Sequence, residues 1–194
     1  MSKLKYIFVG ALMLLLTTMA TAQEKYQIVE NAGHLVLKGT SNTTDWQLKT
    51  TLLEGDAQLK MIGGELSAIS RVLVDIQGKS IENKLNKRMT NKAHKALKVR
   101  EHPLVTFYAY GFGEKPDGTR QIKGNISIAG KNVDLIFDFT SHTKDDIVWI
   151  VAEADAKFSD FDMEPPTDFG GAITCKDAIK IEVELPFTLP TTED

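Results

Sequence analysis

Apolar and polar residues alternate with a period of two along most of this chain. Near the C-terminal end, charged residues separate Ile179, Ile181, Val183 and Leu185. The same period returns at 72–76, 122–128 and 135–139. A period of two places one set of side chains on one face of a β-strand and the other set in water. Many such strands predict an all-β antiparallel sheet, and closing that sheet into a barrel removes its exposed edges.

Turn residues divide this pattern into segments of strand length. The expected strands are 26–31, 34–39, 46–53, 56–62, 66–77, 105–113, 120–129, 133–141, 147–158 and 176–188. We expect the first two to pair around Ala32-Gly33, and the next two to pair around Glu54-Gly55. No linker is long enough to separate two domains, so we expect residues 23–194 to form one domain.

One segment, from Ile81 to Val99, breaks the alternation. Its apolar residues recur at helical spacing and predict a short helical excursion that ends before His102-Pro103: Ile81, Leu85, Met89, Ala93, Ala96 and Leu97. The other face is basic, with Lys84, Lys87, Arg88, Lys92, Lys95, Lys98 and Arg100. An ordinary solvated helix face is the favoured interpretation. The alternative is a basic cover over the barrel mouth that meets an anionic head group or a membrane surface.

The N-terminus has the pattern of a secretory signal. Lys3 and Lys5 precede an almost wholly apolar run at 7–16, and Ala20-Thr21-Ala22 fits the small-x-small cleavage rule. We therefore expect residues 1–22 to be removed after Ala22 and the protein to be periplasmic or secreted. Without the two lysines, 21 basic residues stand against 26 acidic ones, a net charge of −5. That balance argues against nucleic acid as a partner.

The sequence contains no motif that predicts catalysis. Its four histidines are scattered, and there is no phosphate-binding glycine loop, nucleophile elbow or CxxC pair. We therefore predict no catalytic residue, no metal and no cofactor. Cys175 is the one cysteine. A small structural residue is the favoured interpretation of Cys175 over a reactive thiol, because no histidine motif surrounds it.

The interior of the predicted barrel is the better candidate for function. The alternation points ten side chains inward: Val72, Val74, Phe107, Ile126, Leu135, Phe137, Ile150, Ala154, Ile181 and Val183. Successive small residues at Ala152, Ala154 and Ala156 fit either the taper of a filled barrel or a cavity. A cavity lined also by Phe139 would suit a long hydrocarbon chain, whose transfer from water gains ~0.8 kcal/mol per CH₂.

Five further residues complete the candidate ligand-binding set: Trp46, Met89, Leu97, Phe158 and Phe161. Trp46 ends a polar run that starts at Gly39. It is interpreted either as a plug beneath the barrel, which is favoured, or as a ligand contact.

A series of short motifs runs along the chain. The first consists of Gly39, Ser41, Asp45 and Trp46. The others, in order, are Ser80, Met89, Ala96-Leu97, Pro103, Phe107, Gly124, Gly130, Phe158, Asp160-Phe161, Pro165-Pro166, Gly170-Gly171-Ala172 and Lys176-Asp177. In this order and spacing they resemble the YceI-like family of lipid- and polyisoprenoid-binding proteins, which commonly has histidine where this chain has Thr44.

The resemblance implies an eight-stranded, lipocalin-like antiparallel β-barrel with an elongated apolar tunnel. It implies a non-catalytic carrier of an isoprenoid chain, such as a quinone or polyprenyl diphosphate tail, or of another long-chain lipid such as a fatty amide. The alternatives are a filled barrel that acts in envelope stress or protein interaction and, third, an enzyme acting on a bound isoprenoid. The sequence leaves open whether the barrel forms a homodimer.

Overall fold

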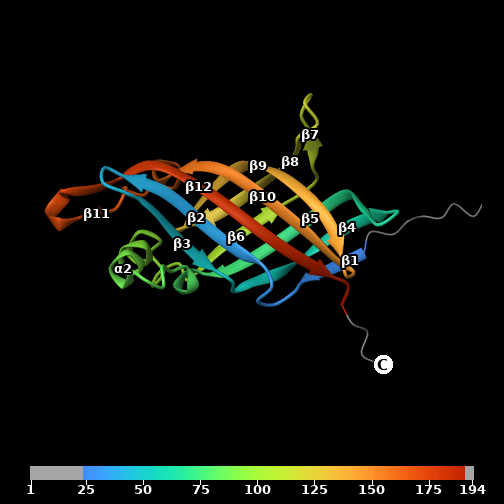
Figure 1. Cartoon of the computed structure of the whole chain (residues 1–194), viewed down its shortest axis with the longest axis horizontal. Helices are drawn as coiled ribbons and strands as arrows, with labels where there is room; N and C mark the ends of the chain where they lie inside the picture. Colours follow the sequence, from blue (N-terminus) through green and yellow to red (C-terminus); the bar gives the residue numbers. More distant parts are fainter. Residues whose placement is uncertain (1–23, 191–194) are drawn as a thin grey trace, which may run out of the picture.

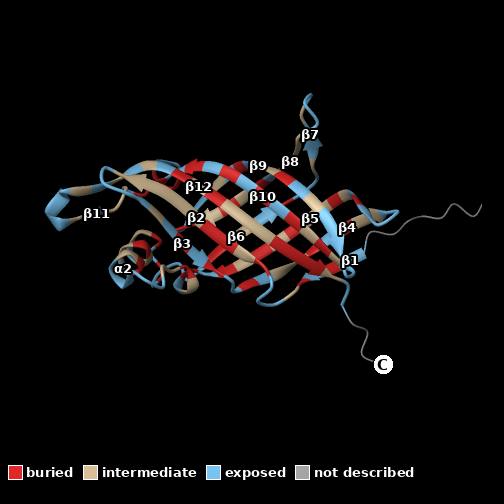
Figure 2. Ribbon diagram, viewed as in Figure 1, coloured by how far each residue is buried: buried red, intermediate tan, exposed pale blue. Residues whose placement is uncertain are grey.

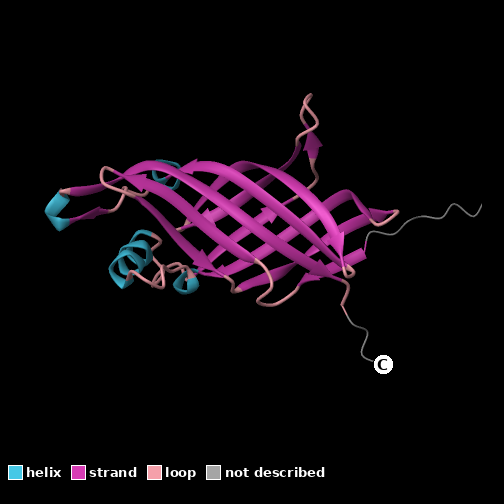
Figure 3. Cartoon of the chain, in the orientation of Figure 1, coloured by secondary structure: helices cyan, strands magenta, loops and turns pink. Residues whose placement is uncertain are grey.

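Strands carry most of residues 24–190, the part of the chain that the computed structural model describes (Figures 1 and 3). The strands are β1 (Glu24–Ile28), β2 (His34–Ser41), β3 (Asp45–Thr50), β4 (Leu53–Ile62), β5 (Glu65–Gln77), β6 (Leu104–Ala109), β7 (Gly113–Glu114), β8 (Arg120–Ile128), β9 (Lys131–Lys144), β10 (Ile147–Lys157), β11 (Thr167–Asp168) and β12 (Ile173–Thr188). The helical elements are α2 (Lys87–Ala96) and the 3-10 turns η2 (Gly78–Ser80), η3 (Phe158–Phe161) and η4 (Phe169–Gly171). The predicted signal peptide and its cleavage site lie outside the described residues.

Eight strands form a closed antiparallel ring in the order β1, β4, β5, β6, β8, β9, β10 and β12. The last link is short: β12 returns to β1 through the pairs Gln27–Thr188 and Ile28–Phe187. All-β architecture and closure into an eight-stranded barrel are therefore confirmed. Within residues 24–190, no helix is long and apolar enough to cross a membrane.

The period of two in the sequence becomes the division between core and surface (Figure 2). In β10, buried and exposed residues alternate without interruption from Ile150 to Lys157. Near the end where β1 closes the ring, Ala57, Leu59 and Phe187 have no exposed surface. Hydrophobic side chains therefore fill that end of the barrel.

The two predicted N-terminal hairpins are wrong. β1 pairs with β4 and β12 and not with β2, while β3 pairs with β2 and not with β4. Gly55 lies within β4 and forms no turn, and a Cβ there would stand 2.0 Å from the carbonyl oxygen of Leu73 on β5. Alternation identifies a strand, but the partner of that strand depends on where the chain turns in space.

The hairpin of β2 and β3 extends the wall at the opposite end of the ring, where β2 lies along β12. The free edge of β3 meets the segment that precedes α2: the backbone N–H groups of Lys49 and Glu82 donate to each other's carbonyls, at 2.8 and 3.1 Å. Asn83 adds a side-chain bond of 3.1 Å to the carbonyl of Gln47. The predicted helical excursion is thus part of the barrel wall.

The helix itself is shorter than the predicted excursion, because Glu82 and Asn83 bond to the edge of β3 and α2 begins only after Asn86. The Asn86 side chain accepts a hydrogen bond of 3.0 Å from the Met89 N–H and so marks where α2 begins. Leu85 precedes that start and is 99% exposed, so the prediction that it belongs to the buried stripe is wrong. Ile81, Ala93 and Leu97 are buried as expected.

Candidate ligand-binding cavity

A cavity of about 330 Å³ lies at the end of the barrel where Figure 1 shows α2 and β11. Its wall comes from α2, the β2–β3 hairpin, η3, the loop that carries β11 and η4, and strand β12, together with Ile128 of β8. The volume falls within the range of about 300–1,000 Å³ typical of small-molecule sites. We call this space the mouth cavity.

A narrow space of about 60 Å³ lies deeper in the barrel, and every residue that lines it is apolar. Four residues line both this inner space and the mouth cavity: Leu37, Leu97, Ile128 and Ile181. The two spaces therefore share a wall, and together they follow the barrel interior from the mouth towards the packed end. The sequence did not decide between a filled core and a cavity. The structure contains both, at opposite ends of the barrel.

Most of the predicted site residues line one of these two spaces. Around the mouth cavity lie Trp46, Met89, Leu97, Phe158, Phe161 and Ile181. Around the inner space lie Val72, Val74, Phe107, Ile126, Phe137, Ile150 and Val183. Leu135, Phe139 and Ala154 are buried but line neither space.

Trp46 reaches the mouth cavity by crossing its neighbouring strand. Its register partner on β2 is Gly39, and the indole lies against that glycine, where a side chain would block it. The ring centroid is 6.1 Å from that of Phe158, and the indole N–H donates to the Thr40 carbonyl at 3.3 Å. This position in the wall of the mouth favours a ligand contact over a plug beneath the barrel.

Asp177 positions the two phenylalanines of η3. Its carboxylate accepts hydrogen bonds from the Ser159 hydroxyl at 2.6 Å and from the Ser159 N–H at 2.9 Å. These two bonds hold the pKa of Asp177 below its ordinary value, and the bond from the hydroxyl has the larger effect. Because Ser159 lies between Phe158 and Phe161, the contact fixes the turn that directs both rings inward, where they are buried.

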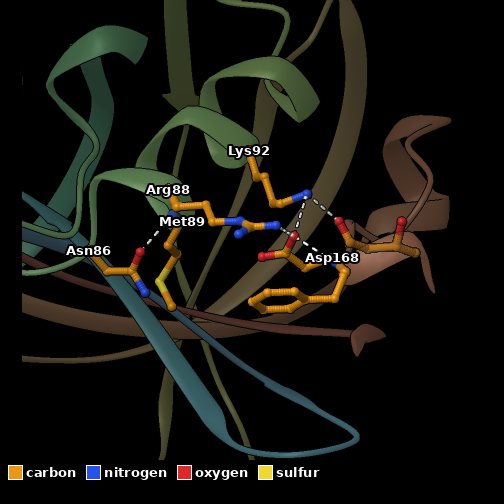
Figure 4. A network of polar contacts seen from close by, with 7 residues as sticks. Asn86, Arg88, Met89, Lys92 and Asp168 are labelled. Atoms are coloured by element: carbon orange, nitrogen blue, oxygen red, sulfur yellow. Dashed lines mark hydrogen bonds and ion pairs between the residues drawn. The ribbon is translucent and has the colours of Figure 1, made fainter. Parts of the chain in front are cut away.

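The rim of the mouth cavity is polar and charged (Figure 4). Arg88 and Lys92 extend from α2 towards Asp168, which ion-pairs with both side chains. Partial burial would raise the pKa of Asp168, but hydrogen bonds from the Phe169 N–H, Arg88 and Lys92 outweigh it and lower that pKa. Two of the seven basic residues between Ser80 and His102 thus face an acid at the mouth. The other five, Lys84, Lys87, Lys95, Lys98 and Arg100, are exposed.

Cys175 also lines the mouth cavity. Burial raises the pKa of its thiol, with smaller opposing effects from Lys92 and the Trp46 indole. A raised pKa keeps the sulfur protonated and unreactive at neutral pH. The structure therefore favours the structural interpretation of Cys175 over the reactive one.

The histidines have separate local contacts. His34 pairs with Glu184, His142 stacks on Trp149, and a ring nitrogen of His94 lies 3.0 Å from the Ile81 carbonyl oxygen. Within residues 24–190, no three or more His, Cys, Asp or Glu side chains gather closely enough to hold a metal ion.

A wider groove of about 720 Å³ lies on the other side of Trp46. Lys38, Asp155 and Lys180 are among the residues that line it. Six of its fifteen lining residues are charged, against three of twenty-five for the mouth cavity, so less of its lining is apolar. The mouth cavity is therefore the better candidate site.

Sequence reasoning missed the loop that carries β11. Thr167, Asp168 and Phe169 all line the mouth cavity, yet they follow Pro165-Pro166 in a stretch without periodicity. Asp168 lies 80 residues from Arg88 in the chain. No local pattern predicts such a contact.

Comparison with known proteins agrees with the fold and the family resemblance. A family model described as the YceI-like domain matches residues 24–187. No curated protein sequence matches the chain.

The solved structures that are similar in fold include the following three. The crystal structure of Burkholderia cenocepacia BcnA has a TM-score of 0.63 at 13% identity, over 82% of this chain and 98% of that one. A polyisoprenoid binding domain from Saccharophagus degradans has a TM-score of 0.59 at 9% identity, over 85% and 98%. The Campylobacter jejuni YCEI protein has a TM-score of 0.51 at 20% identity, over 69% and 79%. At these identities the similarity extends to the fold alone.

Proposed function

The chain belongs to the YceI-like family, and on this premise we propose that it is an exported, non-catalytic carrier that binds one long apolar chain, such as an isoprenoid or fatty-acyl lipid, inside the barrel. The observation that carries the proposal is the wall shared by the mouth cavity and the inner space. An apolar chain that enters between α2 and the β2–β3 hairpin can continue past Leu97 and Ile181 towards the middle of the barrel. Each CH₂ removed from water contributes ~0.8 kcal/mol.

The aromatic residues of the mouth support this role. Trp46 comes from β3 and Phe158 and Phe161 come from η3, and all three present flat apolar surfaces to the cavity. Aromatic rings supply large contact area and few rotatable bonds, so ordering them around a ligand costs little entropy.

Export is part of the proposal and rests on the sequence alone. The apolar run at 7–16 and the small residues at 20–22 are the supporting features. N-terminal sequencing of protein from the envelope fraction should find a chain that begins at Gln23. A chain that keeps Met1 in the cytoplasm would contradict export and leave the cavity unaffected.

The second candidate function is a protein-interaction module built on a filled barrel. The packed end of the barrel around Leu59 and Phe187 supports it. We favour the carrier because the interaction module assigns no role to an apolar cavity of about 330 Å³.

We further propose that the mouth faces an anionic membrane surface. Leu85 is 99% exposed and Phe169 is 64% exposed, and Lys84 and Lys87 flank the leucine. Exposed apolar side chains among lysines are typical of peripheral contact with anionic lipid. Such contact would bring the cavity to the lipid from which a chain is taken.

Extraction and titration together test the carrier. Protein purified without detergent is extracted with organic solvent and the extract is analysed by mass spectrometry; stripped protein is then titrated with a fluorescent long-chain probe. We expect an apolar chain in the extract and saturable binding of one probe per protein. A Trp46→Ala variant should bind more weakly, while Trp149→Ala, outside the mouth and the inner space, should bind normally. An extract free of lipid together with non-saturable binding would contradict the carrier.

A further inference from the structure

We propose that Arg88 and Lys92 form an anion-binding subsite at the mouth, and that the Asp168 carboxylate occupies this subsite in the present structure. The ligand of the cavity is then a long-chain anion whose carboxylate or phosphate head replaces Asp168. The inference rests on the proposed carrier function and adds the chemical class of the head group.

The three donors of the subsite converge on a single oxygen (Figure 4). Arg88 and Lys92 are one turn apart on α2, so both side chains lie on the same face of the helix. Arg88 donates to Asp168 Oδ1, the Lys92 ammonium lies 3.3 Å from that atom, and the Phe169 N–H donates to it at 2.8 Å. Two cations and a backbone N–H are the donors that carboxylate and phosphate groups prefer.

The guanidinium of Arg88 is held in place by a second contact. Its central carbon lies 4.2 Å from the centroid of the Phe169 ring, a cation–π geometry. Lys92 also donates to the Thr167 carbonyl. Thr167 and Phe169 flank Asp168, so both cations keep these contacts when the Asp168 side chain alone rotates away.

The charge balance of the mouth cavity favours an added anion. Among the described residues that line the cavity, the charged side chains are Arg88, Lys92 and Asp168. The lining thus carries a charge of +1, although the chain as a whole carries −3. One anionic head group would neutralise this charge. When that head group replaces the Asp168 carboxylate, Arg88 and Lys92 keep an anionic partner, whereas a neutral head would leave both cations without one.

Asp168 is placed where a ligand can displace it. It lies on the short β11–η4 loop, and its side chain is 18% exposed, whereas those of Arg88 and Lys92 are 57% and 36% exposed. Water around the two cations screens these ion pairs and weakens them. When the apolar chain of a ligand is already bound in the cavity, its head group is held close to Arg88 and Lys92. This high local concentration helps the head group to displace Asp168.

Ligands with one chain and different heads test the inference. Hexadecanoic acid, hexadecyl phosphate and hexadecanol displace the fluorescent probe from wild type, from Arg88→Gln/Lys92→Gln and from the matched control Lys87→Gln/Lys95→Gln. The control positions lie on the same helix but line neither the mouth cavity nor the inner space. Comparison of hexadecanoic acid with hexadecyl phosphate shows whether the subsite prefers a carboxylate or a phosphate head group.

We expect wild type and the control to prefer at least one anion over the alcohol by about tenfold or more. The Arg88/Lys92 variant should lose that preference and keep its affinity for hexadecanol within about twofold. Asp168→Asn should bind the preferred anion several-fold more tightly than wild type, because the competing carboxylate is gone. A variant that had merely lost its fold could not show this gain.

Two outcomes would overturn the inference, and only the second would also reject the carrier function. Equal affinity for anions and alcohol in wild type, with all three bound saturably, would reject the subsite and leave the carrier standing. Saturable binding of none of the three would reject the carrier, and the subsite with it.

Discussion

The indole of Trp46 lies directly on Gly39, its cross-strand partner, so closely that a Cβ at position 39 would stand 2.2 Å from a ring carbon. Because Gly39 on β2 has no side chain, the Trp46 side chain of β3 can cross that strand and form part of the mouth of the cavity. The pair therefore links a local feature of the sheet to the shape of the candidate site.

Gly39→Ala should force the indole out of its position and destabilise the protein by about 1–3 kcal/mol, the usual cost of overpacking. In a Trp46→Leu background the same alanine should cost much less, because the ring it meets is gone. Urea unfolding of the four proteins gives the coupling energy. Equal costs of Gly39→Ala in both backgrounds would show that the contact is not what requires glycine.

Substitutions at two alanines can distinguish the cavity from the packed core. Ala93 lines the mouth cavity and Ala154 is buried outside both spaces. Ala93→Phe should occupy the cavity and lower the affinity for a long-chain probe at least tenfold, at a cost in stability of about 1 kcal/mol or less. Ala154→Phe should instead destabilise the fold by about 1–3 kcal/mol. Thermal unfolding and probe titration measure both effects; undiminished probe binding by a folded Ala93→Phe would place the ligand elsewhere.

The thiol of Cys175 should report occupancy of the mouth. Because burial raises its pKa, alkylation by N-ethylmaleimide at pH 7 should be slow compared with the urea-unfolded protein, and should accelerate with pH. A saturating neutral long-chain alcohol should slow it further. Mass spectrometry follows the reaction. Fast labelling that a bound chain does not affect would contradict the placement of Cys175 in the cavity wall.

The lowered pKa of Asp177 predicts that the stability of the protein depends on pH. Its pKa is lower in the folded protein than in an unfolded chain, so its contribution is fully present above the unfolded value of about 4 and is lost as pH falls through the lower folded value. Asp177→Asn should therefore be clearly less stable than wild type at pH 6, and the gap should narrow near pH 3.

Ser159→Ala, which removes the hydroxyl partner, should show a pH profile similar to that of Asp177→Asn. Denaturant unfolding at both pH values measures the gaps. A gap between wild type and Asp177→Asn that is independent of pH would show that the charge on Asp177 has no part in holding η3.

Vesicle sedimentation tests the membrane surface. Lys84→Gln/Leu85→Ser/Lys87→Gln should reduce binding to vesicles with anionic lipid, because each lysine near such a surface contributes about 1 kcal/mol. Two lysines correspond to roughly thirtyfold in affinity. Binding by wild type should weaken with salt.

The matched control for the vesicle experiment lies at the other end of the barrel. Lys60→Gln/Ile62→Ser/Lys144→Gln removes the same kinds of side chain near the β4–β5 and β9–β10 turns. It should bind vesicles as wild type does. If both triple variants lose binding equally, the charge of the whole chain, and not the mouth, attracts the lipid.

The sequence by itself determined most strands of the barrel and the side chains that turn inward. Val148, Ile150 and Ala152 are buried because a strand's side-chain period is fixed by covalent geometry, whatever the strand pairs with. The β8–β9 hairpin was also predictable, because Ala129 and Gly130 form a local turn that takes both residues to positive φ.

The tertiary structure alone decided which strands became neighbours and what closed the cavity. β1 pairs with β12 near the other end of the chain, Glu82 bonds to the edge of β3, and Asp168 meets Arg88 across 80 residues. Each contact depends on how far the sheet has twisted when the chain returns, and many long-range closures cost nearly the same entropy. The order of residues along the chain does not specify that geometry. The barrel's lining and several residues of its mouth therefore followed from the sequence, whereas the loop that completes the mouth did not.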